Sequence, residues 1–504
     1  MNTLNYKTLE EIGYQGFLQP KDAPEKVLQF GEGNFLRAFV DRFFDLAAEK
    51  SGWRGKVVLV QPIAGSYGFA DGINAQDALY TVYLRGREDG EVVDETRVIS
   101  SCSRCLNPYR AEDYAAIMDV AVSDDLEFIV SNTTEAGIAY DPSCTAADQP
   151  PASFPAKLAQ VLHARWAAKK PGVIILSCEL IDHNGAELLR IVKQYAADWG
   201  WEDEFVAWLE GDCTFCTTLV DTIVPGRIRD PKEAAEVAER LGYEDPFLAV
   251  REPFQMWGIQ GSEELAAKLP FTAAGLPGVF VTPDVTPYKK RKVRILNGAH
   301  TGFVPGAWLA GFDIVRDCMH DEVVAGFMKK LLNDEVIPTL AADLDVEDCK
   351  RFAAAVESRF DNPFIDHQLL SICLNSTAKW AARDLPTLLD YVTEKGELPR
   401  CLTTSLAALI AFYTTGFEAR EADGLHLRRA DGTAYVAADD GFVLDFYAEH
   451  HADEDAALVH AVLSNEHMWG QDLTAVEGLE AAVLAALETV RAEGAKAAFA
   501  ACLA

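Results

Sequence analysis

Short apolar runs alternate with amphipathic stretches through the first half of the chain. Apolar runs that fit buried strands lie at residues 26–30, 56–61, 126–132, 172–178 and 279–282. Helical spacing of apolar residues predicts helices over residues 35–44, 111–122 and 155–169. Strands that alternate with helices predict a doubly wound, mainly parallel sheet, whose ligands bind at the carboxyl ends of the strands. Alternating residues on either side of Glu88-Asp-Gly90 predict an antiparallel hairpin over residues 79–100, inserted at the sheet edge.

The pattern changes after Thr282, where helical periodicity runs almost to the end of the chain. The strongest helical stretches are residues 323–332, 385–394, 402–412 and 456–504. The fold class predicted is therefore α/β plus all-α. A Rossmann-like doubly wound domain spans residues 1–282, and a mostly helical domain that carries substrate and catalysis spans residues 283–504. A small-molecule site is expected in the cleft between two such domains.

Charge narrows the possible partners. The chain has 45 basic and 78 acidic residues, a formal charge of −33, which argues against nucleic acid and anionic membranes as partners. No apolar run is long enough to span a bilayer, and the first residues lack the apolar core of a signal peptide. We therefore expect a cytoplasmic protein that acts on a small molecule, and the sequence leaves its oligomeric state open.

Eleven cysteines without a secretory signal are expected to be reduced thiols. Two pairs, Cys102-Ser-Arg-Cys105 and Cys213-Thr-Phe-Cys216, have the spacing of metal ligands. They could meet in a folded domain as a four-thiolate zinc site. More than a hundred residues separate the pairs, so we predict buried thiols and no metal.

A glycine turn follows the first predicted strand. The sequence Phe30-Gly-Glu-Gly-Asn-Phe-Leu-Arg37 joins that strand to a helix, an arrangement that presents a helix N-terminus to a phosphate. The third glycine of the usual dinucleotide motif is replaced by Leu36, so a simple tight turn is an alternative. No acidic residue lies between Val57 and Ala70, where many dinucleotide folds grip the ribose, so the choice between NAD and NADP stays open.

A second chemical motif lies in the basic run at residues 288–294. The sequence Lys292-Val-Arg-Ile-Leu-Asn297-Gly-Ala-His300 places an amine, a carboxamide and an imidazole on one predicted helix. At about 100° per residue, Asn297 lies about 140° from Lys292 and His300 about 80° from it. The three groups suit moving a proton on and off a carbonyl or alcohol oxygen while holding that oxygen. The alternative is a solvated basic helix end.

These motifs together resemble the long-chain polyol dehydrogenases, the mannitol dehydrogenase family. The glycine turn is similar to that family's cofactor motif, and Lys292-x4-Asn297-x2-His300 is similar to its catalytic motif. The resemblance also takes in, in chain order, Val220-Asp221, Glu252-Pro-Phe254 with Trp257, Arg359-Phe-x-Asn362-Pro363 and Lys379.

The resemblance implies a metal-independent, NAD-dependent oxidoreductase. It implies Lys292 as proton donor and acceptor, with Asn297 and His300 polarising the reacting oxygen. The residues implied to bind the cofactor are Phe30, Gly31, Glu32, Gly33, Asn34, Phe35, Leu36 and Arg37. The stretches at residues 131–137 and 178–182 resemble members that act on sugar acids.

Two departures from the polyol pattern bear on the substrate. Leu180 stands where mannitol-type members have an asparagine that helps hold the reacting oxygen, and Ser371 stands in place of an arginine. Both tell against mannitol, so a sugar acid, a keto-uronate or aldonate, is the expected substrate. Asp221, His367 and Lys379 are the candidate substrate-binding residues, with a structural role equally open for His367. A polyol substrate, a non-catalytic sensor and a zinc protein remain as alternatives.

Overall fold

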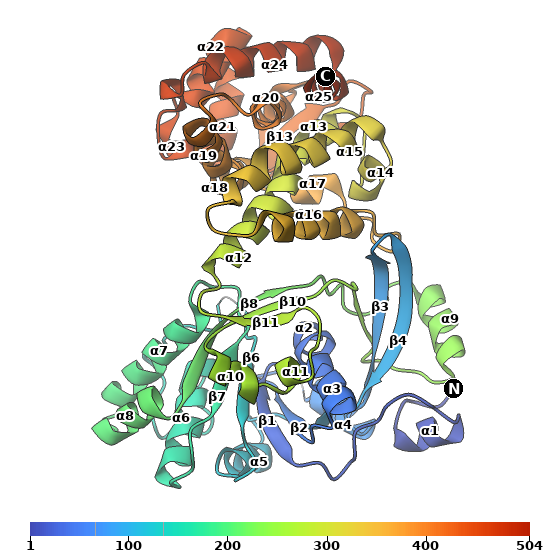
Figure 1. The fold of residues 1–504 in the computed structure, drawn as a ribbon, viewed down its shortest axis with the longest axis vertical. Helices are drawn as coiled ribbons and strands as arrows, with labels where there is room; N and C mark the ends of the chain where they lie inside the picture. The colour runs from blue at the N-terminus through green and yellow to red at the C-terminus, as the bar shows by residue number, and fades with distance from the viewer. Residues whose placement is uncertain (66, 135) are drawn as a thin grey trace. The chain divides into compact units, whose positions relative to one another are not determined.

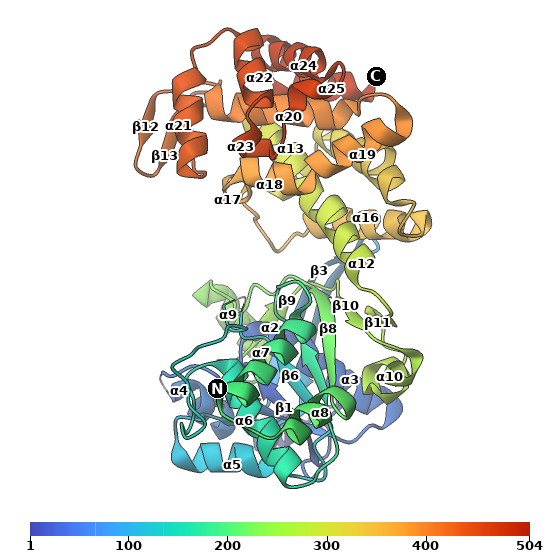
Figure 2. The ribbon, with the colours of Figure 1, turned by 90° about the vertical axis from the view of Figure 1, so that its left-hand side faces the viewer.

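The structure is a computed structural model that describes residues 1–65, 67–134 and 136–504 (Figures 1 and 2). It divides into two compact units. The first comprises Met1–Arg85 and Val92–Val285, and the second comprises Gly86–Glu91 and Thr286–Ala504. The tip of one hairpin thus belongs to the second unit, where Arg87 forms an ion pair with Asp361 at 3.0 Å.

An eight-stranded sheet forms the centre of the first unit, in the order β11-β10-β8-β7-β6-β1-β2-β5. Every neighbouring pair from β8 to β5 is parallel, and β10 is antiparallel to β8. Its strands are β1 (Glu25–Phe30), β2 (Lys56–Val60), β5 (Cys102–Leu106), β6 (Phe128–Ser131), β7 (Ile174–Ser177), β8 (Thr214–Asp221), β10 (Met256–Gln260) and β11 (Val279–Thr282). The strand order reverses between β1 and β6, which confirms the predicted Rossmann-like sheet and places its ligand crevice there.

Alternate residues of each strand enter two separate hydrophobic cores. Val27, Val57 and Phe128 face one core, whereas Leu28 and Val58 face the other. Figure 1 shows α6, α7 and α8 on one side of the strands and α2 and α3 on the other. The helices of the first unit are α1 (Tyr6–Glu11), α2 (Asn34–Ala38), α3 (Val40–Ser51), α4 (Gly68–Ala75), α5 (Ala111–Ala121), α6 (Phe154–Ala167), α7 (Asn184–Asp198), α8 (Asp203–Gly211), α9 (Pro231–Leu241), α10 (Glu263–Lys268) and α11 (Pro270–Ala273).

Two expectations for the first unit are wrong. The predicted hairpin, β3 (Tyr80–Glu88) and β4 (Glu91–Ile99), is not at the edge of the main sheet but pairs with β9 (Ala249–Arg251) in a three-stranded sheet. The helix predicted across residues 35–44 breaks at Phe39, whose ψ is −73°, so α2 and α3 are separate helices.

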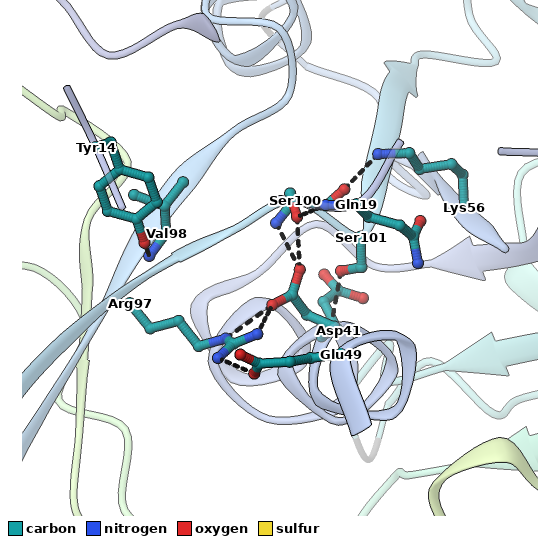
Figure 3. A network of polar contacts seen from close by, with 10 residues as sticks. Tyr14, Gln19, Asp41, Glu49, Lys56, Arg97, Val98, Ser100 and Ser101 are labelled. Carbon is teal, nitrogen blue, oxygen red and sulfur yellow. Dashed lines mark hydrogen bonds and ion pairs between the residues drawn. The ribbon is translucent and has the colours of Figure 1, made fainter. Parts of the chain in front are cut away.

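A buried polar network fastens α3 to the strands beside it. Arg97 of β4 forms ion pairs with Asp45 at 2.5 Å and Glu49 at 2.7 Å, both on α3 (Figure 3). The Asp45 carboxylate also accepts bonds of 2.8 Å from the backbone N–H and the hydroxyl of Ser100. Lys56 of β2 donates to the Ser100 carbonyl at 2.5 Å. Each buried charge therefore has an opposite charge or hydrogen-bond partner, which burial requires.

Two helices that are buried on nearly every side form the centre of the second unit. They are α13 (Gly298–Leu309) and α20 (Arg400–Thr414), in which every residue from Cys401 to Thr414 is buried. Figure 2 shows α20 between α22 and α24 on one side and α18 on the other. The remaining helices are α12 (Thr286–Arg291), η1 (Lys292–Asn297), α14 (Val315–Met319), α15 (Glu322–Lys330), η2 (Leu331–Val336), η3 (Ile337–Leu340), α16 (Val346–Phe360), α17 (Leu369–Ile372), α18 (Ser376–Arg383), α19 (Leu385–Lys395), α21 (Gly441–His450), α22 (Asp455–Leu463), α23 (Glu466–Trp469), η4 (Leu473–Ala475), α24 (Leu479–Glu493) and α25 (Ala495–Leu503).

The second unit is mostly helical, as predicted, but it also holds an antiparallel sheet. Its strands are β12 (Ala419–Glu421), β13 (Gly424–Arg428) and β14 (Ala434–Ala437). The helical stretch predicted over residues 456–504 is a series of helices, with breaks that include Gly494 at φ +92°. Within the described ranges, no helix has both the length and the apolar character needed to cross a bilayer.

Candidate functional site

The glycine turn lies at the strand-order reversal, directly after β1. Gly31 has φ +127°, and a Cβ atom there would lie 3.0 Å from the carbonyl oxygen of Asn132, which follows β6. Only glycine fits this close approach. At Gly33, by contrast, a Cβ atom would meet nothing within 4 Å, and no side chain caps the start of α2. The turn therefore has free space at Gly33 and a helix start without a side-chain cap, two features that a phosphate site needs.

Arg37 stabilises the turn from inside the protein. Its guanidinium donates to the Glu32 carbonyl at 2.9 Å, the Asn34 side-chain oxygen at 2.6 Å and the Phe247 carbonyl at 2.6 Å. The residue is only 3% exposed. Arg37, one of the eight residues predicted to bind the cofactor, thus directs its donors to the Glu32 and Phe247 carbonyls and to the Asn34 side chain.

The predicted catalytic helix contains a π-helical segment. Residues Lys292–Asn297 form η1 between α12 and α13, and the Gly298 N–H bonds to the carbonyl of Val293, five residues back. A π-helical turn holds about one residue more than an α-helical turn, so each residue advances by roughly 80–85°. Asn297 then lies about 50° from Lys292, and His300 about 10° from it on the other side. The structure brings the three side chains into a narrower arc than the predicted α-helix would.

His300 is held as a neutral imidazole between aromatic rings. It stacks on Phe360 at 4.0 Å between ring centres and meets the edge of His367 at 5.3 Å. Burial, together with His367, Arg359, Arg383 and Lys379, holds the pKa of His300 well below its ordinary value. Its Nε2 atom is buried and has no hydrogen-bond partner within the described protein. That nitrogen therefore has an unused hydrogen-bonding position.

Two cations of α18 lie close enough to this imidazole to lower its pKa. Lys379 and Arg383 are both half-buried and lie one helical turn apart. Burial, followed by Arg383, lowers the pKa of Lys379, whose Nζ atom donates to the Ile372 carbonyl at 2.9 Å. Arg383 donates to the Thr301 hydroxyl at 3.0 Å, and that hydroxyl donates to the Asn297 carbonyl at 3.0 Å. Helix α18 is thus linked directly to the helix that carries the predicted catalytic residues.

Asp384, at the end of α18, is a buried carboxyl beside this helix. Its Oδ1 atom would lie 2.9 Å from a Cβ atom at Gly298, so a larger residue there would have to displace the carboxyl. Neither of its oxygens has a hydrogen-bond partner among the described residues. Burial raises the pKa of Asp384 well above its ordinary value, although Arg383 and Arg294 oppose the shift.

The basic run around Lys292 is not a solvated helix end. Arg291 and Arg294 are buried, and they form ion pairs with Asp348 and Asp390. Lys290 pairs with Asp343 at 2.6 Å. At least three cations of the basic run therefore form ion pairs that stabilise the fold. This excludes the alternative that the run is only a solvated basic helix end.

The predicted substrate-binding residues fall in both units. His367 and Lys379 join His300 in the second unit, as described above. Asp221 belongs to the first unit, where it is buried at the end of β8 and pairs with Met256 of β10. Leu180, in the position of the missing asparagine, is 61% exposed and follows β7.

Sequence reasoning missed Arg383 and Asp384. The four-residue spacing from Lys379 to Arg383 places both cations on one helix face, and this was the available signal for Arg383. The sequence contains no comparable signal for Asp384, because its position depends on how α18 packs against α13.

The two cysteine pairs cannot share a metal ion. Cys102 and Cys105 lie on β5 and Cys216 lies on β8, with four strands between them. At about 4.8 Å per strand spacing, that is roughly 24 Å. Burial raises the pKa of all four thiols, to about 12 for Cys213 and Cys216. The zinc-protein alternative based on these pairs is therefore wrong.

Comparisons with known proteins agree with the motifs. The profile of the mannitol dehydrogenase Rossmann domain matches residues 25–272, and that of the mannitol dehydrogenase C-terminal domain matches residues 284–491. The altronate oxidoreductase of Bacteroides thetaiotaomicron is 42% identical, with 98% of each chain covered. The altronate oxidoreductase of Pectobacterium atrosepticum is 44% identical, over 98% of this chain and 99% of the relative.

The fold is also shared with a solved structure. The mannitol 2-dehydrogenase of Pseudomonas fluorescens, solved with NAD and D-mannitol, superposes with a TM-score of 0.65 at 23% identity, and 99% of each chain is covered. Both domain profiles and relatives that match over nearly the whole chain lead to one conclusion. This chain belongs to the mannitol dehydrogenase family.

Proposed function

We propose that this protein is an NAD-dependent altronate oxidoreductase, which interconverts D-altronate and D-tagaturonate in hexuronate breakdown. Relatives that carry this name are 42% and 44% identical over nearly the full chain. The structural observation that carries the proposal is the set of cations around a neutral His300, namely Arg359, Lys379 and Arg383. Such a site favours an anionic sugar acid over a neutral polyol.

NAD is assigned to the glycine turn at Phe30–Arg37. The open space at Gly33, the uncapped start of α2 and the close approach at Gly31 fit a dinucleotide pyrophosphate. The mannitol 2-dehydrogenase of Pseudomonas fluorescens, which has a similar fold, was solved with NAD. When bound, the cofactor supplies or receives the hydride of the reaction.

The protein's own residues handle the proton and the reacting oxygen. In reduction, Lys292 gives a proton to the keto oxygen as the alcohol forms, and in oxidation its neutral amine takes that proton back. Asn297 and the buried Nε2 atom of His300 hold the same oxygen by hydrogen bonds. A neutral imidazole suits this role because it can polarise a carbonyl without giving up its proton. The side chain of Leu180 cannot donate a hydrogen bond to the reacting oxygen, so Asn297 and His300 hold that oxygen without a third donor at this position.

The substrate carboxylate is assigned to the cationic face of α18. Lys379 and Arg383 lie on that face, and His367 meets His300 edge-on beside it. A guanidinium binds carboxylates in a fixed two-pronged geometry, so we add Arg383 to Lys379 and His367. Asp221 is proposed to bind substrate hydroxyls. All eleven cysteines are free thiols, which fits the reducing conditions of the cytoplasm.

A nicotinamide absorbance assay tests the proposal. NADH oxidation is followed with tagaturonate, fructuronate and fructose, and then with NADPH in place of NADH. Tagaturonate with NADH is expected to give the highest kcat/KM. Preference for fructuronate or fructose would assign the protein to another activity of the same family. Cofactor binding without turnover of any substrate would indicate a sensor.

A further inference from the structure

Asp41, at the start of α3, lies behind the glycine turn and is fully buried. One of its carboxylate oxygens, Oδ2, is approached by three donors from three different strands. They are the Gln29 amide of β1 at 3.3 Å, the Tyr80 hydroxyl of β3 at 3.0 Å and the Cys102 thiol of β5 at 3.5 Å. The Ser101 hydroxyl also donates to the Asp41 carbonyl at 2.8 Å (Figure 3).

Two of these donors also bind the backbone of the turn. The same Gln29 amide nitrogen lies 3.1 Å from the Gly31 carbonyl, and the same Tyr80 hydroxyl lies 3.0 Å from the Arg37 carbonyl. The Asp41 carboxyl is therefore linked through Gln29 to Gly31 and through Tyr80 to Arg37, the two ends of the turn. Gly31 needs such an external hold because glycine has little conformational preference of its own.

We propose that Asp41 is a positioning residue for the cofactor: through Gln29 and Tyr80 it fixes the Gly31 and Arg37 carbonyls, and so the N–H groups that face the pyrophosphate. This inference rests on the proposed binding of NAD at the turn. Asp41 itself touches neither the cofactor nor the substrate.

The protonation of Asp41 gives this role a distinctive signature. Burial raises the pKa of Asp41 to about 7, against the opposing effects of Tyr80, Gln29, Cys102 and Arg37. Tyr80 and Cys102 have pKa values raised well above their ordinary ranges, so both stay protonated.

Tyr80 has a single hydroxyl proton to share between two acceptors. An ionised Asp41 draws that proton away from the Arg37 carbonyl, whereas a neutral Asp41 leaves it on the turn. An anionic cofactor also favours the neutral carboxyl. NADH binding is therefore expected to weaken as the pH rises through about 7.

Asp45 provides a matched control one helical turn further along α3. It is equally buried, but its bonds run to Arg97 and Ser100, and among the described residues neither of these bonds to residues 31–37. Asp45→Asn should therefore lower the thermal midpoint of unfolding without changing the affinity for NADH.

The test is a fluorescence titration of the full-length protein with NADH at pH 6 and pH 8. We compare the native chain with D41N, Y80F and D45N. The amide of D41N stays neutral, so its Kd at pH 6 should stay within about twofold of the native value and the weakening at pH 8 should be absent, while kcat at saturating NADH stays within about twofold. Y80F removes the shared hydroxyl but keeps the ring, and should raise the Kd at pH 6 by about five- to tenfold, the scale of one net hydrogen bond.

Each outcome decides between named alternatives. A native Kd that is independent of pH, a D41N variant whose Kd rises with pH as the native Kd does, or a Y80F variant that binds NADH like the native chain would overturn the positioning role. A loss of affinity in D45N equal to that in Y80F would show an effect of general stability and would also overturn it. If D41N does not fold, Y80F against D45N decides the question. A native chain that binds no NADH would instead refute the proposed function.

Discussion

The two candidate binding regions use charge in opposite ways. At the glycine turn, the cation within the motif, Arg37, is buried and donates to Glu32, Asn34 and Phe247, so its charge is used within the protein and the proposed phosphate contacts are those of the backbone. Around His300, the cations Lys379 and Arg383 are half-buried side chains that remain close enough to lower the pKa of the imidazole.

This difference separates a general binding mode from a selective one. A backbone cradle recognises any pyrophosphate, and it needs glycine at only one or two positions. A cationic face recognises one substrate class, and it depends on side chains that packing brings together from distant segments. We therefore expect mutations in the second region to change which substrate is used and mutations in the first to change cofactor affinity.

The largest effect is expected at Lys292. Lys292→Ala should lower kcat by about 10²–10⁴-fold, because the proton donor is lost, while the Kd for NADH changes little. Lys292→Arg should also be poor, because a guanidinium does not release its proton. Steady-state kinetics and NADH titration measure both. Lys290→Ala, two residues before Lys292, removes a cation that pairs with Asp343 and is the matched control; its kcat should stay within about twofold. Near-native turnover in Lys292→Ala would move the catalytic role to another residue.

The cationic face gives the next largest effect. Lys379→Met and Arg383→Met should each lower kcat/KM for tagaturonate by about 10–100-fold, the range for hydrogen bonds to a charged group. Arg383→Lys should recover part of that loss, since it restores the charge but not the two-pronged geometry. The Kd for NADH should not move in any of the three. Equal losses with tagaturonate and with fructose, which has no carboxylate, would show that these residues do not read the acid group.

Asp384→Asn should change the pH dependence of stability. Because the folded carboxyl has a raised pKa, its stabilising contribution is complete below about pH 4 and is lost as the pH rises toward the folded value. The amide does not titrate, so the free energy of unfolding of the variant, relative to that of the native chain, should rise by up to about 1.4 kcal/mol per pH unit within that window. Urea unfolding at pH 5 and pH 8 measures the gain. If the variant and the native chain differ in free energy of unfolding by the same amount at pH 5 and at pH 8, Asp384 is ionised in the folded state at both pH values.

The smallest expected effect is that of metal removal. Activity should survive prolonged treatment with a chelator, because the proposed roles of Lys292, Asn297 and His300 need only protein donors. Metal analysis of the treated enzyme serves as the control. Loss of activity that zinc restores would place a metal in the reaction and contradict the proposed mechanism.

Local sequence signals were enough for the fold class and for the motifs. Buried strands of β-branched and leucine residues, the glycines at the turn and the spacing from Lys292 to His300 are all visible without a structure. The first unit is a confirmed Rossmann-like sheet. The individual catalytic and binding residues stay predictions until the variants above are measured.

What the sequence hid depends on tertiary packing or on weak local preferences. Residues Lys292–Asn297 have side chains that suit an α-helix, so the π-helical segment could not be read from them. The pairing of Asp384 with Gly298 joins segments more than eighty residues apart. The sheet β12–β14 did carry signals, namely the turns Asp423-Gly424 and Asp431-Gly432 between alternating residues, but the surrounding helical periodicity obscured them.

The π-helical segment has a consequence for how this site tolerates genetic change. A π-helical turn is equivalent to one residue inserted into an α-helix. Deleting a single residue between Lys292 and Asn297 would restore α-helical turns and place His300 about 20° from Lys292, close to its present angle of about 10°. Reversion to α-helical turns without a deletion would instead place His300 about 80° from Lys292. The directions of the three side chains are therefore expected to survive the loss of one residue from this segment, provided that the π-helical turn is lost with it.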